Sequence, residues 1–245
     1  MTGIFSISRM EIKKIIFDTS TYVFLIILCI ATIIDNVLYY HMNLNKSIEL
    51  SGNIGISLFI IQIYFIYLGS NMIGSEFSFG TSKMVFSSVY SRSQIIHIKS
   101  ISFLFYTSLY GIFNILIGLT VQCIIGKHFS SMEILSTLFS VWIVYIVYFS
   151  SILSVGIFTI SITFNRVYSL IIGYVLYIFL YSIGIQIVER DESWMKTIME
   201  NTPFFIASDG FSTLYYNIND IVYLSFFSVV IYIIGLYIIK KRDLK

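Results

Sequence analysis

The side chains of this chain that could take part in binding chemistry gather in one polar segment, residues 75–99, between two long apolar runs. The residues of this segment that we select as candidates for docking a partner are Glu76, Gly80, Thr81, Lys83, Met84, Arg92 and Lys99. They combine one carboxylate and three cations with small and apolar positions. This mixture favours recognition of a protein surface by charge pairing and apolar contact over bond-making chemistry.

No pattern typical of a catalytic or metal site occurs in the sequence. A nucleotide-binding P-loop needs Gly-x-x-x-x-Gly-Lys-Ser/Thr, and the nearest stretch, residues 80–83, lacks the first glycine and the final hydroxyl. The three histidines are scattered and form no pair at metal-ligand spacing on one helix: His41, His97 and His128. A group of serines at 150–154 has no basic residue at a similar depth and is better explained by helix packing. We therefore expect neither enzymatic activity nor a metal or cofactor in this chain.

The elements that must position the polar segment are membrane helices. The chain is 57% hydrophobic and 11% charged, with a mean hydropathy of +0.88, whereas soluble domains carry about 25% charged residues. A helix needs about 20 apolar residues to cross the ~30 Å hydrocarbon layer. Six runs are long enough: 20–40, 53–74, 100–125, 134–164, 167–188 and 221–239. We predict an all-α integral membrane protein with six transmembrane helices and a single transmembrane domain over residues 1–245.

The cations indicate how these helices are oriented. With the N-terminus inside, 11 of the 15 Lys and Arg residues lie on the cytoplasmic side. The four on the outer side are Lys46, Lys127, Arg190 and Lys196. The positive-inside rule therefore predicts that both termini and segment 75–99 are cytoplasmic.

Three stretches need more than a plain span. The fourth run is too long for one straight crossing at ~1.5 Å per residue, so we expect it to tilt, to break near Gly156 or to extend beyond the membrane. Ahead of the first run, apolar residues at 5, 12, 15 and 16 lie opposite cations at 9, 13 and 14, which is typical of an interfacial helix. The outer connection 189–219 is rich in aromatic residues, and we predict a re-entrant segment of short helices broken at Pro203.

The polar segment itself divides into two helices. Thr81 could cap a short helix with an apolar side at Met84, while Ser91 and Gln94 have the Ser-x-x-Gln spacing of a capping box. We therefore expect Ser91 to open the third long helix. From residue 91 to 125 such a helix would be about 51 Å long, so its first turns, with Arg92, His97 and Lys99, should project into the cytoplasm.

One acidic residue, Asp35, lies in the outer part of the first apolar run. An ionisable group within a span is a candidate for a transport role by default. Asp35 is only about five residues from the outer boundary, however, and could instead reach interfacial water. The sequence leaves both interpretations open.

The order of these features resembles the membrane subunit of ABC-2 type ATP-binding-cassette transporters. The residues that carry the resemblance are Glu76, Gly80-Thr81-x-Lys83, Ser91-Arg92, Lys99 and the tail Lys240-Lys241-Arg242-Asp243-Leu244. One departure is Tyr90, where the family often has proline before the Ser-Arg pair. Within the family, the chain is similar to small permeases that export bacteriocins or give immunity to them.

The resemblance implies a permease in the bacterial plasma membrane that is moved by a separate ATPase. Residues 75–99 would then contain the coupling helix that docks on the ATP-binding-cassette ATPase, with ATP and Mg²⁺ held by that partner. A second permease, identical or different, would complete the transporter, and no nucleic acid is expected to bind. The substrate expected from the apolar chain is an amphipathic or hydrophobic peptide or antibiotic.

Related exporters line their translocation route with spans two and five. The candidates here are Asp35, Tyr64, Tyr67, Tyr174, Tyr177 and Tyr181, although in a chain with 19 Tyr and 22 Phe such aromatics could equally pack or face lipid. The alternative function is an ATP-independent membrane immunity protein that binds a membrane-active peptide, which would leave residues 75–99 unexplained. A channel would need a ring of charges or a filter-like sequence, and we find neither.

Overall fold

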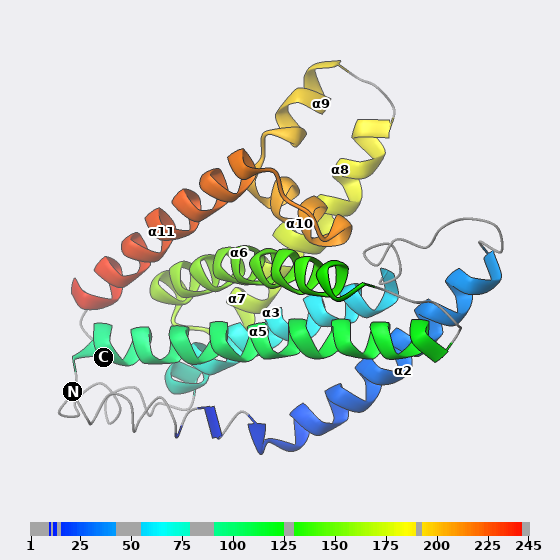
Figure 1. Ribbon diagram of the computed structural model, residues 1–245. Coiled ribbons are helices and arrows are strands. Elements are labelled where there is room, and N and C mark those ends of the chain that lie inside the picture. Colours follow the sequence, from blue (N-terminus) through cyan, green and yellow to red (C-terminus); the bar gives the residue numbers. More distant parts are fainter. Residues whose placement is uncertain are drawn as a thin grey trace.

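In the computed structural model, the described residues are 10, 12–13, 16–42, 55–78, 91–124, 130–189 and 193–241. Every regular element among them is helical (Figure 1). Six stretches are long and apolar enough to span a membrane: Thr19–Leu38, Gly55–Gly74, Ser93–Val121, Ser131–Thr163, Arg166–Glu189 and Ile218–Lys241. The prediction of an all-α chain with six membrane-spanning helices is confirmed, with boundaries that differ by a few residues.

The first three spans are the helices α2 (Thr19–Met42), α3 (Gly55–Ser78) and α5 (Arg92–Ile124). Helix α5 begins where the capping box predicted. The backbone N–H of Ser91 donates to the Gln94 side chain at 2.9 Å, and the Gln94 N–H donates back to the Ser91 hydroxyl at 3.4 Å. The helix then continues for 33 residues, about 50 Å, as its length in sequence predicted.

Helix α6 (Ser131–Thr163) is also 33 residues long and is unbroken. It begins at a second capping box, formed by Ser130 and Glu133, and its first ten residues are largely exposed. Of the three alternatives for this run, a break near Gly156 is therefore wrong, and tilt and extension beyond the membrane stay predictions. At this position the Ser169 hydroxyl of α7 donates to the Gly156 carbonyl at 3.4 Å.

Helix α6 is the centre of the bundle. It contacts α3, α5, α7, α10 and α11, and most of its residues from Val141 to Ser161 are buried. An aromatic cluster joins it to its neighbours. Six rings have centroids 4.8–6.1 Å from that of Phe65 of α3, and they belong to Phe24, Tyr64, Phe103, Tyr106, Tyr110 and Phe149. Edge and tilted contacts of this kind add to the apolar burial that fixes the bundle.

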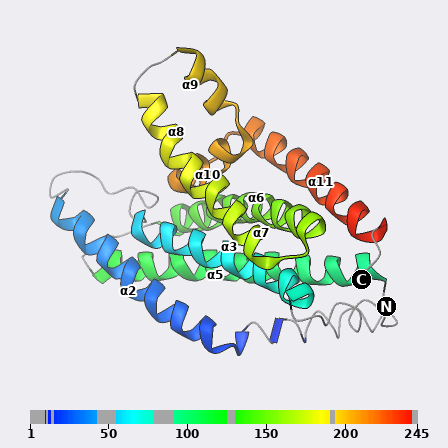
Figure 2. The same cartoon turned by 180° about the vertical axis from the view of Figure 1, so that it is seen from behind.

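The fifth span is divided by a π-helical turn. It comprises α7 (Arg166–Tyr174), the π turn η1 (Val175–Phe179) and α8 (Leu180–Glu189). The N–H of Leu180 donates to the carbonyl of Val175, five residues back, so this turn holds one residue more than an α-helical turn. Figure 2 shows α7 and α8 crossing the bundle on the side of α3. The sequence predicted the span and not the π turn.

Two short helices, α9 (Ser193–Glu200) and α10 (Pro203–Thr213), precede the last span, α11 (Ile218–Lys241). Pro203 is the first residue of α10, so the predicted pair of short helices interrupted at this proline is confirmed. Helix α10 contacts α3, α6, α8, η1 and α11 and buries Phe205 and Phe211. Its apolar face thus packs against the rest of the protein.

The predicted N-terminal interfacial helix lies mostly outside the described residues. Of that stretch, residues 10, 12, 13 and 16 are described, and they are helical.

Candidate functional site

Most of the predicted docking residues lie outside the part of the chain that the structure describes. This applies to Gly80, Thr81, Lys83 and Met84. Glu76 belongs to the end of α3 and Arg92 is the first residue of α5, and their side chains are likewise not among those described. The docking assignment therefore stays a prediction.

Lys99 is the docking candidate whose side chain is described, and its environment differs from the prediction. Only 5% of its surface is exposed, and its Nζ donates to the Met72 carbonyl at 2.7 Å. Lys99 is therefore packed against the last two turns of α3, whereas its expected projection into the cytoplasm stays a prediction. A cation near the carbonyl end of a helix complements its dipole, so Lys99 joins the two helices.

Asp35 has a structural partner that the sequence did not reveal. Its carboxylate accepts hydrogen bonds from the backbone N–H groups of Ile56 at 3.1 Å and Ser57 at 2.8 Å, and the side chain is 7% exposed. These are the free amides of the first turn of α3. Asp35 of α2 therefore caps the N-terminus of the neighbouring helix α3. This capping role is a third explanation, different from both the transport role and contact with interfacial water.

The predicted path aromatics divide into packed and accessible groups. Tyr64 stacks on Phe24, with ring centroids 3.7 Å apart and planes 7° from parallel. Tyr177 is fully buried beside Tyr148. In contrast, Tyr67 is 40% exposed, and Tyr174 is half-buried with its hydroxyl 3.2 Å from the Ile63 carbonyl. Packing explains Tyr64 and Tyr177 without a transport role.

A cavity of about 210 Å³ lies between α3 and α8, the second and fifth spans. Leu58, Phe59 and Ile185 give it apolar walls, and Gln62, Tyr181 and Ser182 add polar groups. Gln62 is 6% exposed, and its side-chain amide has no hydrogen-bond partner among the described residues. A glutamine amide that lines a cavity offers both a donor and an acceptor to a ligand.

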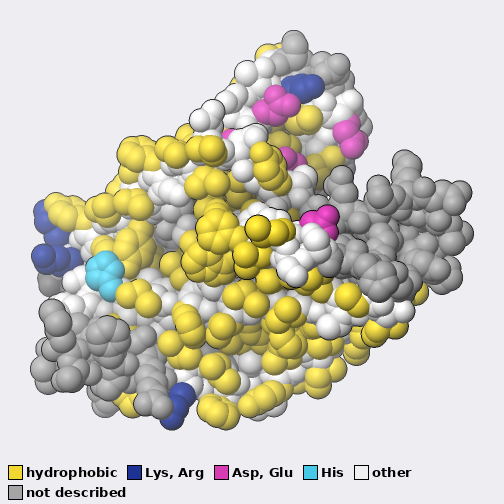
Figure 3. Space-filling model, in the orientation of Figure 1, with side chains coloured by type: hydrophobic (Ala, Val, Ile, Leu, Met, Phe, Trp, Pro, Cys, Tyr) yellow, Lys and Arg dark blue, Asp and Glu magenta, His cyan; other side chains and the backbone are white. Residues whose placement is uncertain are grey.

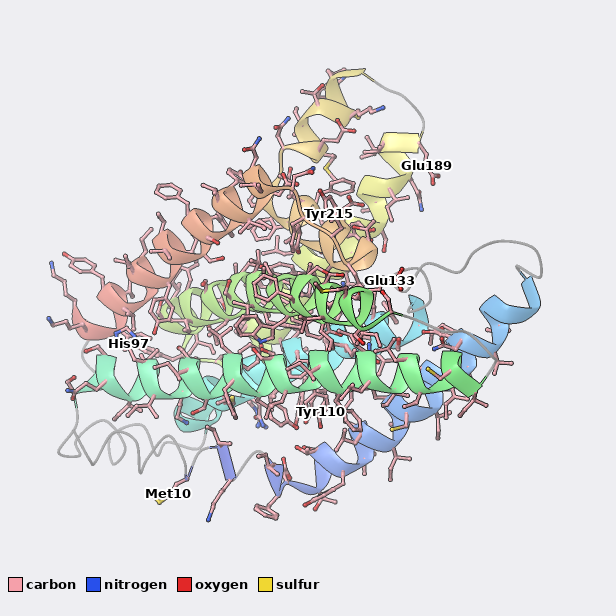
Figure 4. All side chains as sticks on the ribbon, viewed as in Figure 1. Met10, His97, Tyr110, Glu133, Glu189 and Tyr215 are labelled. Carbon is pink, nitrogen blue, oxygen red and sulfur yellow. The ribbon has the colours of Figure 1, made fainter. Side chains whose placement is uncertain are left out.

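A larger cavity, about 470 Å³, lies on the other side of α10, where Glu200, Asp209 and Asp220 line it together with Tyr215. Figure 4 labels Tyr215 beside α10 and α11. Partial burial raises the pKa of Asp209, and the nearby charge of Asp220 raises that pKa further, while the Tyr181 hydrogen bond opposes both. The acidic cavity thus holds a carboxyl group that takes up a proton more readily than usual.

The Tyr181 hydroxyl connects the two cavities. It lies 2.7 Å from the Ser212 hydroxyl and 3.5 Å from a carboxylate oxygen of Asp209. Ser212 lines the smaller cavity and Asp209 the larger. We define the candidate site as Gln62, Tyr181, Asp209 and Ser212, which provides apolar walls, an amide, hydroxyls and an acidic end.

The π turn lies directly behind this site. The Ser208 hydroxyl of α10 donates to the Tyr177 carbonyl in the middle of η1, at 2.8 Å. The site therefore rests on a helix whose own hydrogen bonding is irregular, which is a frequent property of functional sites.

Comparison with known protein families gives one match. The family model described as a protein of unknown function, DUF2705, matches residues 41–245. The chain belongs to the DUF2705 family. No curated protein matches it. The matched region of this DUF2705 chain includes α3 to α11 and therefore every residue of the candidate site.

Of the predicted path residues in the DUF2705 chain, Tyr181 is the one that lines the candidate site. Sequence reasoning missed Gln62, Asp209 and Ser212. Two signals were present: a glutamine within the second apolar run, and a concentration of carboxylates in connection 189–219. Among the described residues, no three His, Cys, Asp or Glu side chains are grouped so as to hold a metal ion.

Proposed function

We propose that this DUF2705 chain is the membrane-spanning permease subunit of an ATP-driven exporter. The observation that carries the proposal is the cavity between α3 and α8, whose walls combine apolar side chains with Gln62 and Tyr181. A site of this kind suits a substrate that is partly apolar and partly able to form hydrogen bonds. The substrate we propose is an amphipathic peptide, such as a peptide toxin or bacteriocin, or an antibiotic.

The energy source in this proposal is a separate ATP-binding-cassette ATPase that docks on residues 75–99 and supplies ATP and Mg²⁺. Two permeases, identical or different, would pair in the bacterial plasma membrane with their termini in the cytoplasm and alternate between inward- and outward-facing states. The resemblance of the Glu76 to Lys99 pattern to ABC-2 permeases supports the partner. A membrane subunit of the staphylococcal phenol-soluble modulin exporter is the specific identity that the sequence resemblance suggests.

Co-purification tests the ATPase partner. Affinity-tagged chain is extracted from its native membrane in mild detergent, and the co-eluting proteins are identified by mass spectrometry. We expect an ATP-binding-cassette ATPase whose activity rises with bound permease. A chain that recruits no ATPase and still protects cells from a membrane-active peptide would favour the ATP-independent immunity protein instead.

Two variants then test where the ATPase docks. Glu76→Lys reverses a charge and Gly80→Trp adds bulk in the proposed docking segment, and both should abolish ATPase recruitment and export while membrane insertion is unchanged. Glu189→Lys is the matched control, because Glu189 is an exposed acid at the far end of α8 (Figure 4). Export that survives both docking variants would overturn the assignment of residues 75–99.

A further inference from the structure

A third cavity, of about 360 Å³, lies between α5, α6 and α11, away from the candidate site. On α5 and α11 its lining residues are spaced by three and four positions, so one face of each helix forms a wall. These residues are His97, Ser100, Ile101 and Leu104 on α5, and Ser225, Ser228, Val229 and Tyr232 on α11. Ser150, Leu153 and Ser154 of α6 form the floor.

The serines of this cavity present little polar surface to an occupant. Four of them already donate their hydroxyl protons to carbonyls of their own helix, at 2.7–2.8 Å: Ser100, Ser150, Ser154 and Ser228. Their small side chains create the space, and their hydrogen bonds leave it largely apolar. An occupant that fills the cavity therefore has to be apolar along its length.

The length of the cavity shows whether a lipid acyl chain or a transmembrane helix could occupy it. The seven steps along α5 from His97 to Leu104 correspond to about 10 Å of helix. This is roughly a third of the ~30 Å hydrocarbon layer. The cavity is therefore too short to seat a transmembrane helix along its span, whereas it can enclose part of an acyl chain.

One end of the cavity is polar and lies near cations. The Tyr232 hydroxyl lies 2.6 Å from Nδ1 of His97 and 3.3 Å from the Ser100 hydroxyl, and Nε2 of His97 has no partner among the described residues. Figure 3 shows cationic side chains at this end of the molecule, near the histidine. The last turn of α11 holds Lys240 and Lys241, and it lies at the same end of the molecule as the start of α5 (Figure 1).

From these features we propose that the cavity binds an acyl chain of an anionic phospholipid. The chain lies between α5 and α11, and the phosphate of the headgroup faces His97, Lys240 and Lys241. Positive charge beside an apolar channel complements a negative headgroup joined to an apolar tail. This proposal concerns a different cavity from the substrate site and does not depend on the exporter function.

Lipid retention by the full chain tests this proposal. The protein is purified in detergent, supplied with phosphatidylglycerol or phosphatidylcholine of identical acyl chains, and analysed by native mass spectrometry. We expect retained phosphatidylglycerol on the wild-type chain and much less phosphatidylcholine. Equal retention of the two lipids would overturn the role of the cations.

Matched variants locate the bound lipid. Ser154→Leu together with Ser228→Leu should fill the cavity and remove the retained lipid, whereas Ser140→Leu, an exposed position on α6 outside the cavity, should not. Lys240→Gln with Lys241→Gln should abolish the preference for phosphatidylglycerol and leave chain binding intact. Unchanged lipid retention in the filled variant would refute the proposal. A wild-type chain that carries no lipid but forms a dimer, which the filled variant loses, would also refute it and would assign the cavity to a second copy.

A second measurement covers the case in which the filled variant does not fold. Wild-type protein is incubated with phosphatidylglycerol that carries a photoreactive group on its acyl chain, irradiated and digested. Labelled peptides from α5 and α11 around residues 97–104 and 225–232 are the expected result. Labels confined to other helices would place the lipid elsewhere.

Discussion

Asp35 allows a structural role to be separated from a transport role in one experiment. Its carboxylate accepts two backbone hydrogen bonds at the start of α3, from Ile56 and Ser57, and Ser57 is fully buried. Asp35→Ala leaves both amides without their partner, and a buried donor left unsatisfied costs roughly 1–3 kcal/mol. We therefore expect a loss of about 2–5 kcal/mol in the free energy of unfolding, a large part of the stability of an ordinary domain.

Asp35→Asn should cost less, because the amide oxygen can still accept one of the two bonds while the charge opposite the helix dipole is lost. The order of thermal stability in detergent, followed by size-exclusion chromatography of heated samples, should be wild type, then Asn, then Ala. Asp220→Ala is the control, since Asp220 is half-buried and accepts a single longer bond, 3.3 Å, from the Asn217 N–H. An Asp35→Ala chain as stable as the wild type, but inactive, would refute the capping role and restore the transport interpretation.

Three further predictions concern Lys99, Gly210 and Asp209. Lys99→Ala should lower thermal stability in detergent even without any ATPase, because it removes the hydrogen bond from α5 to the Met72 carbonyl. Unchanged stability would mean that this bond does not stabilise the fold, and docking would then be the role left for Lys99. Gly210→Ala should destabilise by about 1–3 kcal/mol, because the added methyl would overlap the buried Tyr216 ring. Gly118→Ala, whose methyl would meet the Asn36 side chain at an ordinary 4.0 Å, should not destabilise in the same melting assay. The folded-state pKa of Asp209 is raised above its ordinary value, so the carboxyl group favours the folded state at low pH, and this stability is lost as pH rises through that pKa. Asp209→Asn should therefore flatten the pH dependence of the melting temperature above about pH 4. An unchanged pH profile would contradict this prediction.

The parts of the fold that the sequence predicted depend on local patterns. The lengths of the apolar runs predicted the six spans, and the capping box at Ser91 and Gln94 predicted the start of α5, because its bonds join residues three positions apart. A break near Gly156, one of three alternatives for the fourth run, was wrong because a single glycine does not interrupt the hydrogen bonding of a 33-residue helix.

The roles of the predicted site residues depend on contacts that no local pattern contains. Asp35 and Lys99 find their partners 21 and 27 residues away in sequence, so only the packing of α2, α3 and α5 could reveal their roles. The aromatic residues of spans two and five are chemically alike, and their place in the bundle alone separates the buried Tyr177 from Tyr181 at the cavities. The π turn has neither proline nor glycine to indicate it.

The π turn η1 determines how α8 is rotated relative to α7 in the fifth span. If its five-residue bonding returned to the α-helical pattern, everything beyond Phe179 would turn by about 100° and advance by ~1.5 Å, the increment of one residue. Tyr181 would leave its position against Asp209 and Ser212, and the carbonyl that Ser208 now holds would return to the helix. The bonds that Ser208 and Ser212 of α10 make to Tyr177 and Tyr181 therefore hold α8 in its present rotation.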